Sequence, residues 1–255
     1  MTKRIESLKV IENKPLKKDF FIIELESSIK LPEMMPGQFV QARIDGSPET
    51  FLRRPLSLHD VDYKRNRLKL LVQVVGKGTE SLSKLKTGDF LNLIYPLGNS
   101  FNLPEKEAHT LLVGGGCGIA PLLYLGRYLK SHGIIPDILL GFRNRDRILE
   151  YDDYKAVGNV FLTTEDGSEG EKGFVSDHSV LGNGRYDKVF CCGPEMMMKA
   201  VAAWCIKNNT DCEVSLENLM GCGIGACLCC VVDTVKGHQC TCTDGPVFNI
   251  KELKW

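Results

Sequence analysis

The sequence predicts an N-terminal antiparallel β-barrel, a Rossmann-like α/β domain with a parallel sheet, and a small cysteine-rich module at the C-terminal end. Three observations predict this order. Short apolar strands separated by turn residues fill residues 1–102, as in small antiparallel barrels. Residues 103–216 alternate apolar runs with helix-length segments, as in βαβ units. Residues 217–255 contain six of the eleven cysteines, at positions 222, 227, 229, 230, 240 and 242. These three ranges are the predicted domains.

The composition narrows the classes of partner. Thirty-two basic residues balance thirty-two acidic ones and are scattered along the chain, which argues against nucleic acid or an anionic membrane as a partner. The longest uncharged run, residues 110–126, is shorter than a membrane span and contains five glycines. The first residues show no secretory signal, and an odd number of cysteines favours a reducing compartment. We therefore expect a cytoplasmic protein without a membrane span.

Two segments of the predicted barrel favour anion binding. Strands are expected at 20–25, 38–44 and 68–75. Between the last two, residues 52–57 place the guanidinium of Arg54 near the hydroxyl of Ser57. Residues 75–79 form a glycine loop whose N–H groups can converge on an anion. Either segment alone is typical of an ordinary surface or turn, but together they favour a binding site.

The predicted α/β domain contains a second candidate site. Strands are expected at 110–113, 138–142, 160–163, 188–191 and 212–216. The first runs into the glycine turn 114–118 and Pro121, then a helical pattern at 122–130, which is the geometry that receives a pyrophosphate. Counted from Gly116, this turn reads G-x-G-x-x-P rather than the usual Rossmann pattern. The fourth strand ends in Cys191-Cys192-Gly193-Pro194, and we expect Cys191 to be a buried strand end. The methionines at 196–198 are expected to be core residues of an amphipathic helix.

The cysteine spacing indicates an iron–sulfur cluster. Cys222, Cys227 and Cys230 give C-x4-C-x2-C, the spacing that surrounds a plant-type [2Fe–2S] cluster, and the residues between the first two are small. The spacing leaves the fourth ligand open between Cys240 and Cys242. A tetrahedral zinc site or a reduced cysteine-rich turn are the alternatives. We expect Cys229 to point away from the ligands and to serve in packing.

These segments resemble the ferredoxin-reductase superfamily, in which an R-P-x-S segment and a G-x-G-T loop hold the FAD pyrophosphate and a C-G-P segment approaches the nicotinamide and the flavin. Residues 36–40, 88–89 and 95–98 match this superfamily as well, while Leu56 replaces an aromatic residue found in many relatives. The resemblance implies a catalytic role for Cys192. The cofactor-binding residues that it implies for FAD and NAD are Arg54, Pro55, Leu56, Ser57, Leu71, Val72, Gln73, Gly78, Thr79, Gly115, Gly116, Gly118, Pro121, Gly193 and Pro194.

Over its whole length the chain is similar to the electron-transfer subunits of two-subunit, NAD-linked dihydroorotate dehydrogenases. Those subunits have a C-G-x-G-x-C-x-x-C loop and then a cysteine directly before D-G-P-V-F, which is Cys242 here. Residues 166–168 and 172–174 match them too. The resemblance therefore implies four cluster ligands, called here the four ligand cysteines: Cys222, Cys227, Cys230 and Cys242. It also implies an FMN-containing catalytic subunit as partner, in a heterotetramer of two of each chain, with a role in pyrimidine biosynthesis.

The three cofactors predict the function. Nicotinamide exchanges two electrons as hydride and the cluster exchanges one, so FAD must stand between them. Three cofactor modules use the whole chain, so we expect no dihydroorotate oxidation without the partner's FMN, and we expect residues 246–250 with Trp255 to form an apolar docking surface. The alternatives are a sibling subunit of a hydrogenase or of a ferredoxin:NAD(P) transhydrogenase, or a non-redox protein with a zinc-stabilised tail.

The choice between NAD and NADP stays open in the residues themselves. Arg143, Arg145 and Arg147 follow the second strand of the α/β domain and are suited to a 2′-phosphate, whereas Asp146 and Glu150 argue against one. The resemblance favours NAD.

Overall fold

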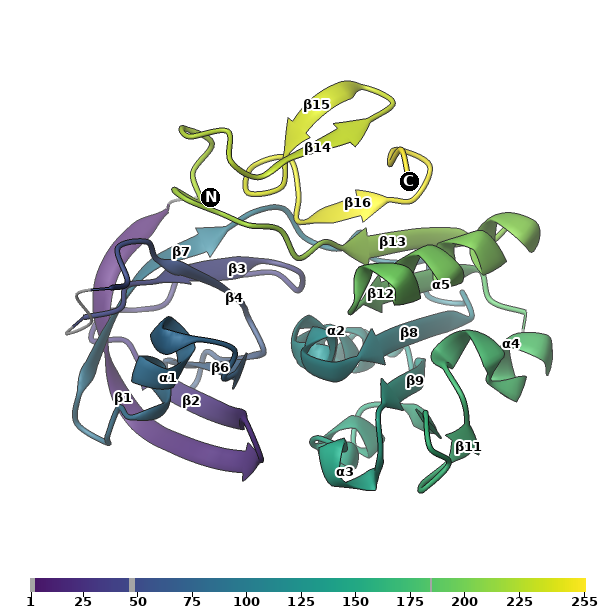
Figure 1. Ribbon diagram of the computed structural model, residues 1–255, viewed down its shortest axis with the longest axis horizontal. Coiled ribbons are helices and arrows are strands. Elements are labelled where there is room, and N and C mark those ends of the chain that lie inside the picture. Colours follow the sequence, from purple (N-terminus) through teal and green to yellow (C-terminus); the bar gives the residue numbers. More distant parts are fainter. Residues whose placement is uncertain (1–2, 46–48, 184) are drawn as a thin grey trace.

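The computed structural model describes residues 3–45, 49–183 and 185–255. Two seven-stranded sheets lie side by side, and a two-stranded hairpin lies over the junction between them (Figure 1). The predicted order of an antiparallel sheet followed by a parallel α/β sheet and a small C-terminal module is confirmed.

The first sheet is antiparallel, with the order β4-β3-β7-β1-β2-β6-β5. In the described part of the chain its edge strands β4 and β5 are not paired with each other, so the sheet forms an open barrel rather than a closed one. Apolar side chains at alternate positions, such as Leu8 and Val10, fill the barrel core. The strands are β1 (Arg4–Lys17), β2 (Phe20–Glu26), β3 (Phe39–Ala42), β4 (Arg54–Ser57), β5 (Asp60–Asp62), β6 (Arg67–Gln73) and β7 (Phe90–Leu97).

The predicted glycine loop at 75–79 is in fact the entry to a helix, α1 (Lys77–Ser83). The backbone N–H groups of Val75 and Gly76 donate to Thr79 Oγ1 at 2.9 and 3.3 Å, and this hydroxyl donates to the carbonyl of Gly76 at 3.0 Å. Thr79 is buried, so its hydroxyl fixes the shape of the turn.

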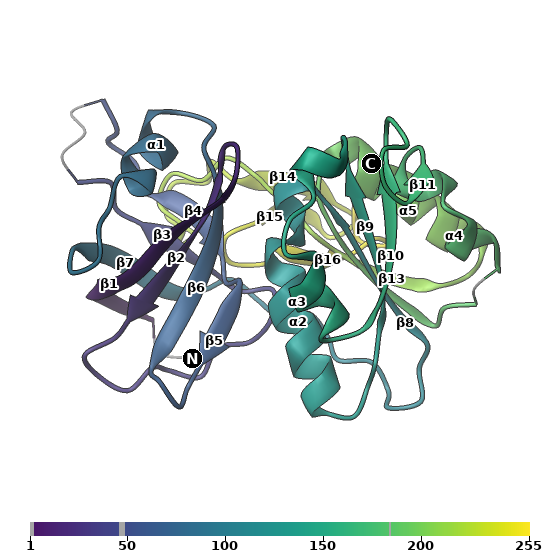
Figure 2. The same cartoon turned by 90° about the horizontal axis from the view of Figure 1, so that it is seen from below.

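The second sheet has the order β11-β10-β9-β8-β12-β13-β16 and is parallel except for β16, which runs antiparallel to β13. Helices α2 and α3 cover the face directed toward the first sheet, and α4 and α5 cover the opposite face (Figure 2). The strands are β8 (Thr110–Gly115), β9 (Asp137–Phe142), β10 (Asn159–Thr164), β11 (Glu171–Lys172), β12 (Lys188–Cys192), β13 (Asp211–Ser215) and β16 (Val247–Asn249). The helices are α2 (Ala120–Ser131), α3 (Tyr151–Lys155), α4 (Ser179–Asn183) and α5 (Glu195–Lys207), with 3-10 turns η1 (Gly116–Ile119), η2 (Arg145–Arg147) and η3 (Val175–Asp177).

Helix α2 joins the two sheets through buried polar contacts. Tyr124 donates from its hydroxyl to the carbonyl of Met34, at 2.8 Å. His59 Nδ1 lies 2.8 Å from the carbonyl of Ala120, and Nε2 lies 2.9 Å from a carboxylate oxygen of Glu150. Both side chains of this pair are almost completely buried. The relative position of the sheets is thus fixed by directional bonds as well as by apolar contact.

The C-terminal module is tied to both sheets. Its hairpin consists of β14 (Val231–Thr234) and β15 (Gly237–Cys240), and β16 extends the second sheet. Asn99, at the end of the barrel segment, donates to the carbonyls of Asp244 and Val247 and accepts from the N–H of Val247. The expected docking surface at 246–250 is wrong, because Val247, Phe248 and Ile250 are buried by this pairing. Trp255 is exposed, as expected.

Among the described residues, no helix is long and apolar enough to cross a membrane.

Candidate functional site

Arg54 and Gly78 meet in the barrel. Arg54 begins β4, and a side chain at Gly78 would place its Cβ 2.9 Å from Arg54 Nε, so only glycine lets the guanidinium lie there. Arg54 Nη1 donates to the carbonyl of Leu52 at 2.8 Å, and among the described residues Arg54 has no carboxylate partner. A half-buried cation without a counter-ion, next to exposed backbone, suits the pyrophosphate of FAD.

The other predicted barrel residues contribute in different ways. Pro55, Leu56 and Ser57 continue β4 and are half-buried. Leu71 and Val72 are buried, with their side chains in the two hydrophobic cores. Gln73 ends β6 and lines the cavity described below.

The glycine turn and the C-G-P segment meet at the carboxyl ends of β8 and β12. These neighbouring strands lie at the point where the strand order reverses, which is where open α/β sheets bind nucleotides. A Cβ at Gly118 would lie 2.4 Å from Gly193 Cα, so the two backbones are in direct contact. A Cβ at Gly115 would lie 2.5 Å from Met197 Sδ and 3.3 Å from Pro194 Cδ. Gly116 has a φ of +56°, and Pro121 lies in the first turn of α2.

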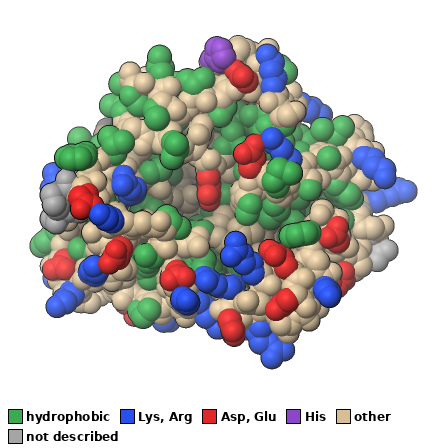
Figure 3. Space-filling model, in the orientation of Figure 1, with side chains coloured by type: hydrophobic (Ala, Val, Ile, Leu, Met, Phe, Trp, Pro, Cys, Tyr) green, Lys and Arg blue, Asp and Glu red, His purple; other side chains and the backbone are tan. Residues whose placement is uncertain are grey.

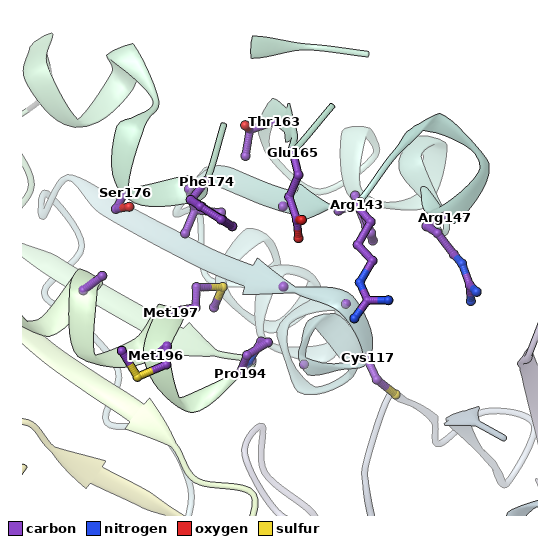
Figure 4. A pocket seen from close by; sticks show the side chains of 18 of the residues that line it. Cys117, Arg143, Arg147, Thr163, Glu165, Phe174, Ser176, Pro194, Met196 and Met197 are labelled. Carbon is purple, nitrogen blue, oxygen red and sulfur yellow. The ribbon is translucent and has the colours of Figure 1, made fainter. Parts of the chain in front are cut away.

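A cavity of about 660 Å³ lies in front of these segments (Figure 4). Residues from every part of the chain line it: Gln73 from the barrel, Gly115–Gly118 and Gly193-Pro194 from the α/β domain, and Glu217 from the C-terminal segment. Gly193 and Pro194 together with Glu217 also line a second cavity of about 390 Å³, between α5 and the C-terminal residues. The larger cavity is therefore the place where all three predicted modules meet.

Burial disfavours the charged forms of two thiols and a carboxyl next to this cavity. Burial raises the pKa of Cys192 well above its ordinary value and raises that of Cys117 to about 12. Glu217 is open to the cavity, yet desolvation by the surrounding protein raises its pKa as well. Cys192 is thus an uncharged thiol, which cannot act as a nucleophile but can pack against a ring. Cys191 is a buried strand residue, as predicted.

The arginines expected near a 2′-phosphate have separate contacts. Arg145 pairs with Glu169 at 3.0 Å, and Arg147 pairs with Asp19 at 3.4 Å. Arg143 points into the cavity from the end of β9, next to Glu165 from the end of β10 (Figure 4). Glu150 is held by His59 and does not line the cavity.

Backbone N–H groups of the cysteine loop donate hydrogen bonds to the sulfur atoms of its own cysteines. Cys222 Sγ accepts from the N–H groups of Ile224, Ala226 and Cys227 at 3.3–3.4 Å, and Cys227 Sγ accepts from Cys222 N–H at 3.4 Å. The N–H of Ile224, followed by that of Cys227, lowers the pKa of the Cys222 thiol to about 6. Donors on sulfur are what an iron–sulfur site requires of its loop.

The four ligand cysteines form two pairs. Cys222 and Cys227 are joined by the bonds just described, and Cys230 and Cys242 are buried together, where burial and then a hydrogen bond with Cys230 raise the pKa of Cys242. A two-iron cluster places its four ligands on two irons. Among the described residues, no three His, Cys, Asp or Glu side chains lie close enough to hold one metal ion. Cys240 lies in the same buried group. Cys229 is exposed, so the expectation that it serves in packing is wrong.

Large apolar side chains are exposed in the cysteine loop and elsewhere in the C-terminal module. Leu219, Ile224, Leu228, Val235 and Trp255 all belong to residues 217–255, and we call them the apolar rim. Figure 3 shows hydrophobic side chains over this upper part of the molecule and a hollow between the two lobes. Met196 is also exposed and lines the cavity, so the expectation that all three methionines are core residues holds for Met198 but not for Met196.

Sequence reasoning missed several residues of the site. Glu165, Phe174 and Glu217 line the cavity but follow no recognisable motif spacing. The only signal for them in the sequence was their position directly after a predicted strand or inside a matching loop segment.

Comparison with known proteins gives two matching family models. Residues 7–101 match an oxidoreductase FAD-binding domain, and residues 217–254 match the iron–sulfur cluster binding domain of dihydroorotate dehydrogenase B.

Curated relatives match nearly the whole chain. A protein of Clostridium acetobutylicum is 40% identical over 96% of this chain and 95% of its own length, and one of Fusobacterium nucleatum is 37% identical over 98% and 99%. Both are named dihydroorotate dehydrogenase B (NAD(+)), electron transfer subunit. Among solved structures, a chain of an NADH-dependent reduced ferredoxin–NADP oxidoreductase aligns with a TM-score of 0.89 at 31% identity, covering 98% of this chain and 90% of that one. A cytochrome P450 reductase of Amycolatopsis, at 23% identity and a TM-score of 0.70, shares the fold over 81% of this chain.

Proposed function

Because this chain belongs to the family of electron transfer subunits of dihydroorotate dehydrogenase B, we propose that it passes electrons between NAD⁺ and the FMN of a catalytic partner subunit that oxidises dihydroorotate to orotate. The observation that supports this most directly is the cavity lined by all three parts of the chain. A site assembled in this way brings a nicotinamide and a flavin together, and Glu217, which lines it, lies in the segment that leads into the cysteine loop.

The residues of the chain hold and separate the reacting groups. Arg54, with the backbone at Gly78, binds the FAD pyrophosphate, and the glycine turn after β8 binds that of NAD. The direct contact of Gly118 with Gly193 fixes the distance between the NAD turn and the C-G-P segment. Cys192 supplies an uncharged, buried surface against which rings can stack. When bound, FAD exchanges electrons in pairs or singly and a [2Fe–2S] cluster exchanges them singly, so together they connect a hydride carrier with a one-electron path.

The four ligand cysteines hold the cluster at the surface of the molecule. Cys222 and Cys227 lie on the more exposed side and Cys230 and Cys242 on the buried side. Leu219, Ile224 and Leu228 of the apolar rim lie in or next to the cysteine loop, and exposed apolar residues near a redox centre suit a stable protein interface. We propose that the catalytic subunit docks here, in an assembly of two copies of each chain.

The coenzyme is inferred from the relatives and the compartment from the cysteines. Glu165 disfavours a 2′-phosphate in the cavity and Arg143 and Arg147 would attract one, so the choice of NAD rests on the names of the curated relatives. All eleven cysteines are free, which fits a cytoplasmic location.

The test uses protein purified without oxygen. We expect two irons, two labile sulfides and one FAD per chain, and NADH oxidation with an artificial acceptor. Dihydroorotate should not be oxidised until an FMN-containing catalytic subunit is added, whereupon NAD⁺-dependent orotate formation begins. A colourless protein with bound zinc would contradict the proposal.

The docking surface is tested by a matched pair of variants. Leu228→Asp in the apolar rim should weaken binding of the partner and leave NADH oxidation by the artificial acceptor unchanged. Ile135→Asp, at an equally exposed position directly before the interior strand β9 of the second sheet, should affect neither. Equal loss of partner binding in both variants would place the interface elsewhere.

One alternative has a specific observation in its favour. The structural match to the ferredoxin–NADP oxidoreductase chain covers almost all of this chain, so a sibling subunit of a transhydrogenase uses the same architecture. Copurification from the native host and identification of the bound chain distinguishes the two, since only the partner differs.

A further inference from the structure

Gln41 is a buried amide without a partner. It lies in β3, its side chain is completely buried, and neither Oε1 nor Nε2 forms a hydrogen bond with any of the described residues. Its backbone carbonyl is satisfied, because Arg53 Nη1 donates to it at 3.1 Å. The unpaired groups are therefore confined to the side chain.

The side chain of Gln41 is directed toward the C-terminal module. Side chains alternate along a strand, and Val40 and Ala42 fill the barrel core. Phe39, two residues before Gln41 and on the same face, packs with Cys230 and Cys242. At β3 the outer face of the barrel is therefore directed toward the cysteine loop, and the side chain of Gln41 lies on that face.

The cysteine loop is in close contact with the side-chain amide of Gln41. A Cβ at Gly223 would lie 2.6 Å from Gln41 Nε2 and 2.5 Å from Cγ. Gly223 directly follows Cys222 and has a φ of +71°, so both its conformation and its contact require glycine. The amide therefore lies beside the first ligand cysteine.

An unpaired amide in this position is costly. Burying such a group without hydrogen bonds costs about 1–3 kcal/mol, whereas methionine or leucine would fill the same space at no such cost. A polar residue retained here indicates an acceptor that is not part of the chain.

We propose that the side-chain amide of Gln41 donates a hydrogen bond to a sulfur of the bound cluster. This inference rests on the proposed cluster site and adds a contact from outside the cysteine loop. Reduction adds negative charge to the sulfurs, so a donor stabilises the reduced cluster and raises its reduction potential. Because Gln41 pairs with Pro55 across β3 and β4, the strand that holds Arg54 is adjacent to the strand that contacts the cluster. Gln41 thus connects the FAD site with the cluster site.

The first test is a redox titration of the cluster followed by electron paramagnetic resonance. Gln41→Met keeps the shape and removes the donor. The equilibrium constant for cluster reduction should fall about tenfold, which corresponds to a potential lower by ~59 mV for one electron. The matched control is Gln38→Met, on the same segment, whose amide bonds with Met35 and Gly98 inside the protein. The control should lower stability and leave the potential unchanged.

A second measurement uses isotope labelling. Protein labelled with ¹⁵N in the side-chain amides of its four glutamines should show a ¹⁵N coupling to the reduced cluster in pulsed electron paramagnetic resonance. This coupling should be lost in Gln41→Met and kept in Gln38→Met. Absence of this coupling in cluster-loaded protein, or an unchanged potential in Gln41→Met, would overturn the inference and assign the amide to an ordered water. Iron and sulfide analysis of the unmodified protein is separate: absence of a cluster there would contradict the proposed function itself.

Discussion

The contact between Gly118 and Gly193 leads to a sharp prediction for Gly118→Ala. The new methyl group would lie 2.4 Å from Gly193 Cα, whereas ordinary carbon contacts are about 3.5–4.0 Å. The two backbones would have to separate by roughly 1 Å, and overpacking of this kind costs about 1–3 kcal/mol. Gly118 has no left-handed backbone, so the contact is the whole source of this cost.

The free-energy cost of Gly118→Ala should appear as weaker binding of NADH. If the displacement opens the NAD turn, the KM for NADH rises about 5-fold to 150-fold, which is the same energy expressed as affinity. FAD and iron content should be unchanged, because Arg54 and the cysteine loop lie in other segments. The assay is steady-state NADH oxidation with an artificial acceptor, together with flavin absorbance and thermal unfolding.

The control is Gly182→Ala in α4, where the added methyl group meets nothing within 4 Å. It should leave KM unchanged and preserve or slightly raise stability. If Gly118→Ala binds NADH normally and also unfolds at the normal temperature, the two segments are not in contact and the assignment of the NAD site is refuted.

Three further predictions concern the cofactors and the pH response. Serine at any of the four ligand cysteines should remove the cluster, measured as iron per chain, while Cys229→Ser and Cys240→Ser retain it; iron loss in Cys240→Ser but not in Cys242→Ser would reverse the assignment of the fourth ligand. Arg54→Ala removes a charge-assisted contact worth about 1.5–3 kcal/mol, so FAD affinity should fall tenfold or more by titration of the apoprotein. Arg43→Ala, which removes an exposed ion pair with Asp45, should leave it unchanged, and equal retention by both variants would contradict the pyrophosphate role. Glu213→Gln should lower the free energy of unfolding by about 1.5–3 kcal/mol, because Lys188 loses its ion pair with Glu213 at 2.8 Å but keeps the one with Asp211 at 2.6 Å. Burial lowers the pKa of Lys188, but the hydrogen bonds that its ammonium donates to Asp211 and Glu213 outweigh burial and raise that pKa above its usual value of 10.5. The stabilisation by these bonds is therefore present below pH 10.5 and is lost as the pH rises further, which denaturant melts across that range measure.

The strands of both sheets were predictable because their signal is local. Residues 20–25 and 138–142 are apolar runs between turn residues, and they became β2 and β9 with shifts of a residue at the ends. Helix α1 was not predictable, because two glycines in its first turn favour a loop. The hydroxyl of Thr79 compensates for them by bonding the preceding N–H groups, which is a contact that spacing alone does not reveal.

The parts of the candidate site that a local motif defines were predictable. The parts whose burial or ion-pair partners depend on tertiary contacts were not. The glycine turn, the C-G-P segment and the cysteine loop lie where the sequence suggested. The run at 246–250 was misread as a docking surface, since its burial depends on pairing with β13, some 35 residues earlier in the chain. Arg145 and Arg147 looked equivalent to Arg143 in the sequence, but partners from distant segments, such as Asp19, separate them. Gln41 lay within a predicted strand, and its importance depends on which module covers that face.

The pairing of β16 with β13 has a consequence for how such proteins can be recombined. The final strand of the cluster segment, Val247–Asn249, completes the edge of the sheet that binds NAD. A chain cut after residue 216 would leave that edge open, and an unpaired edge invites association with other strands. Gene fusions and domain exchanges that transplant the cluster segment alone would therefore have to carry a compatible edge with it. The C-terminal residues and the sheet whose edge they complete would therefore be exchanged together.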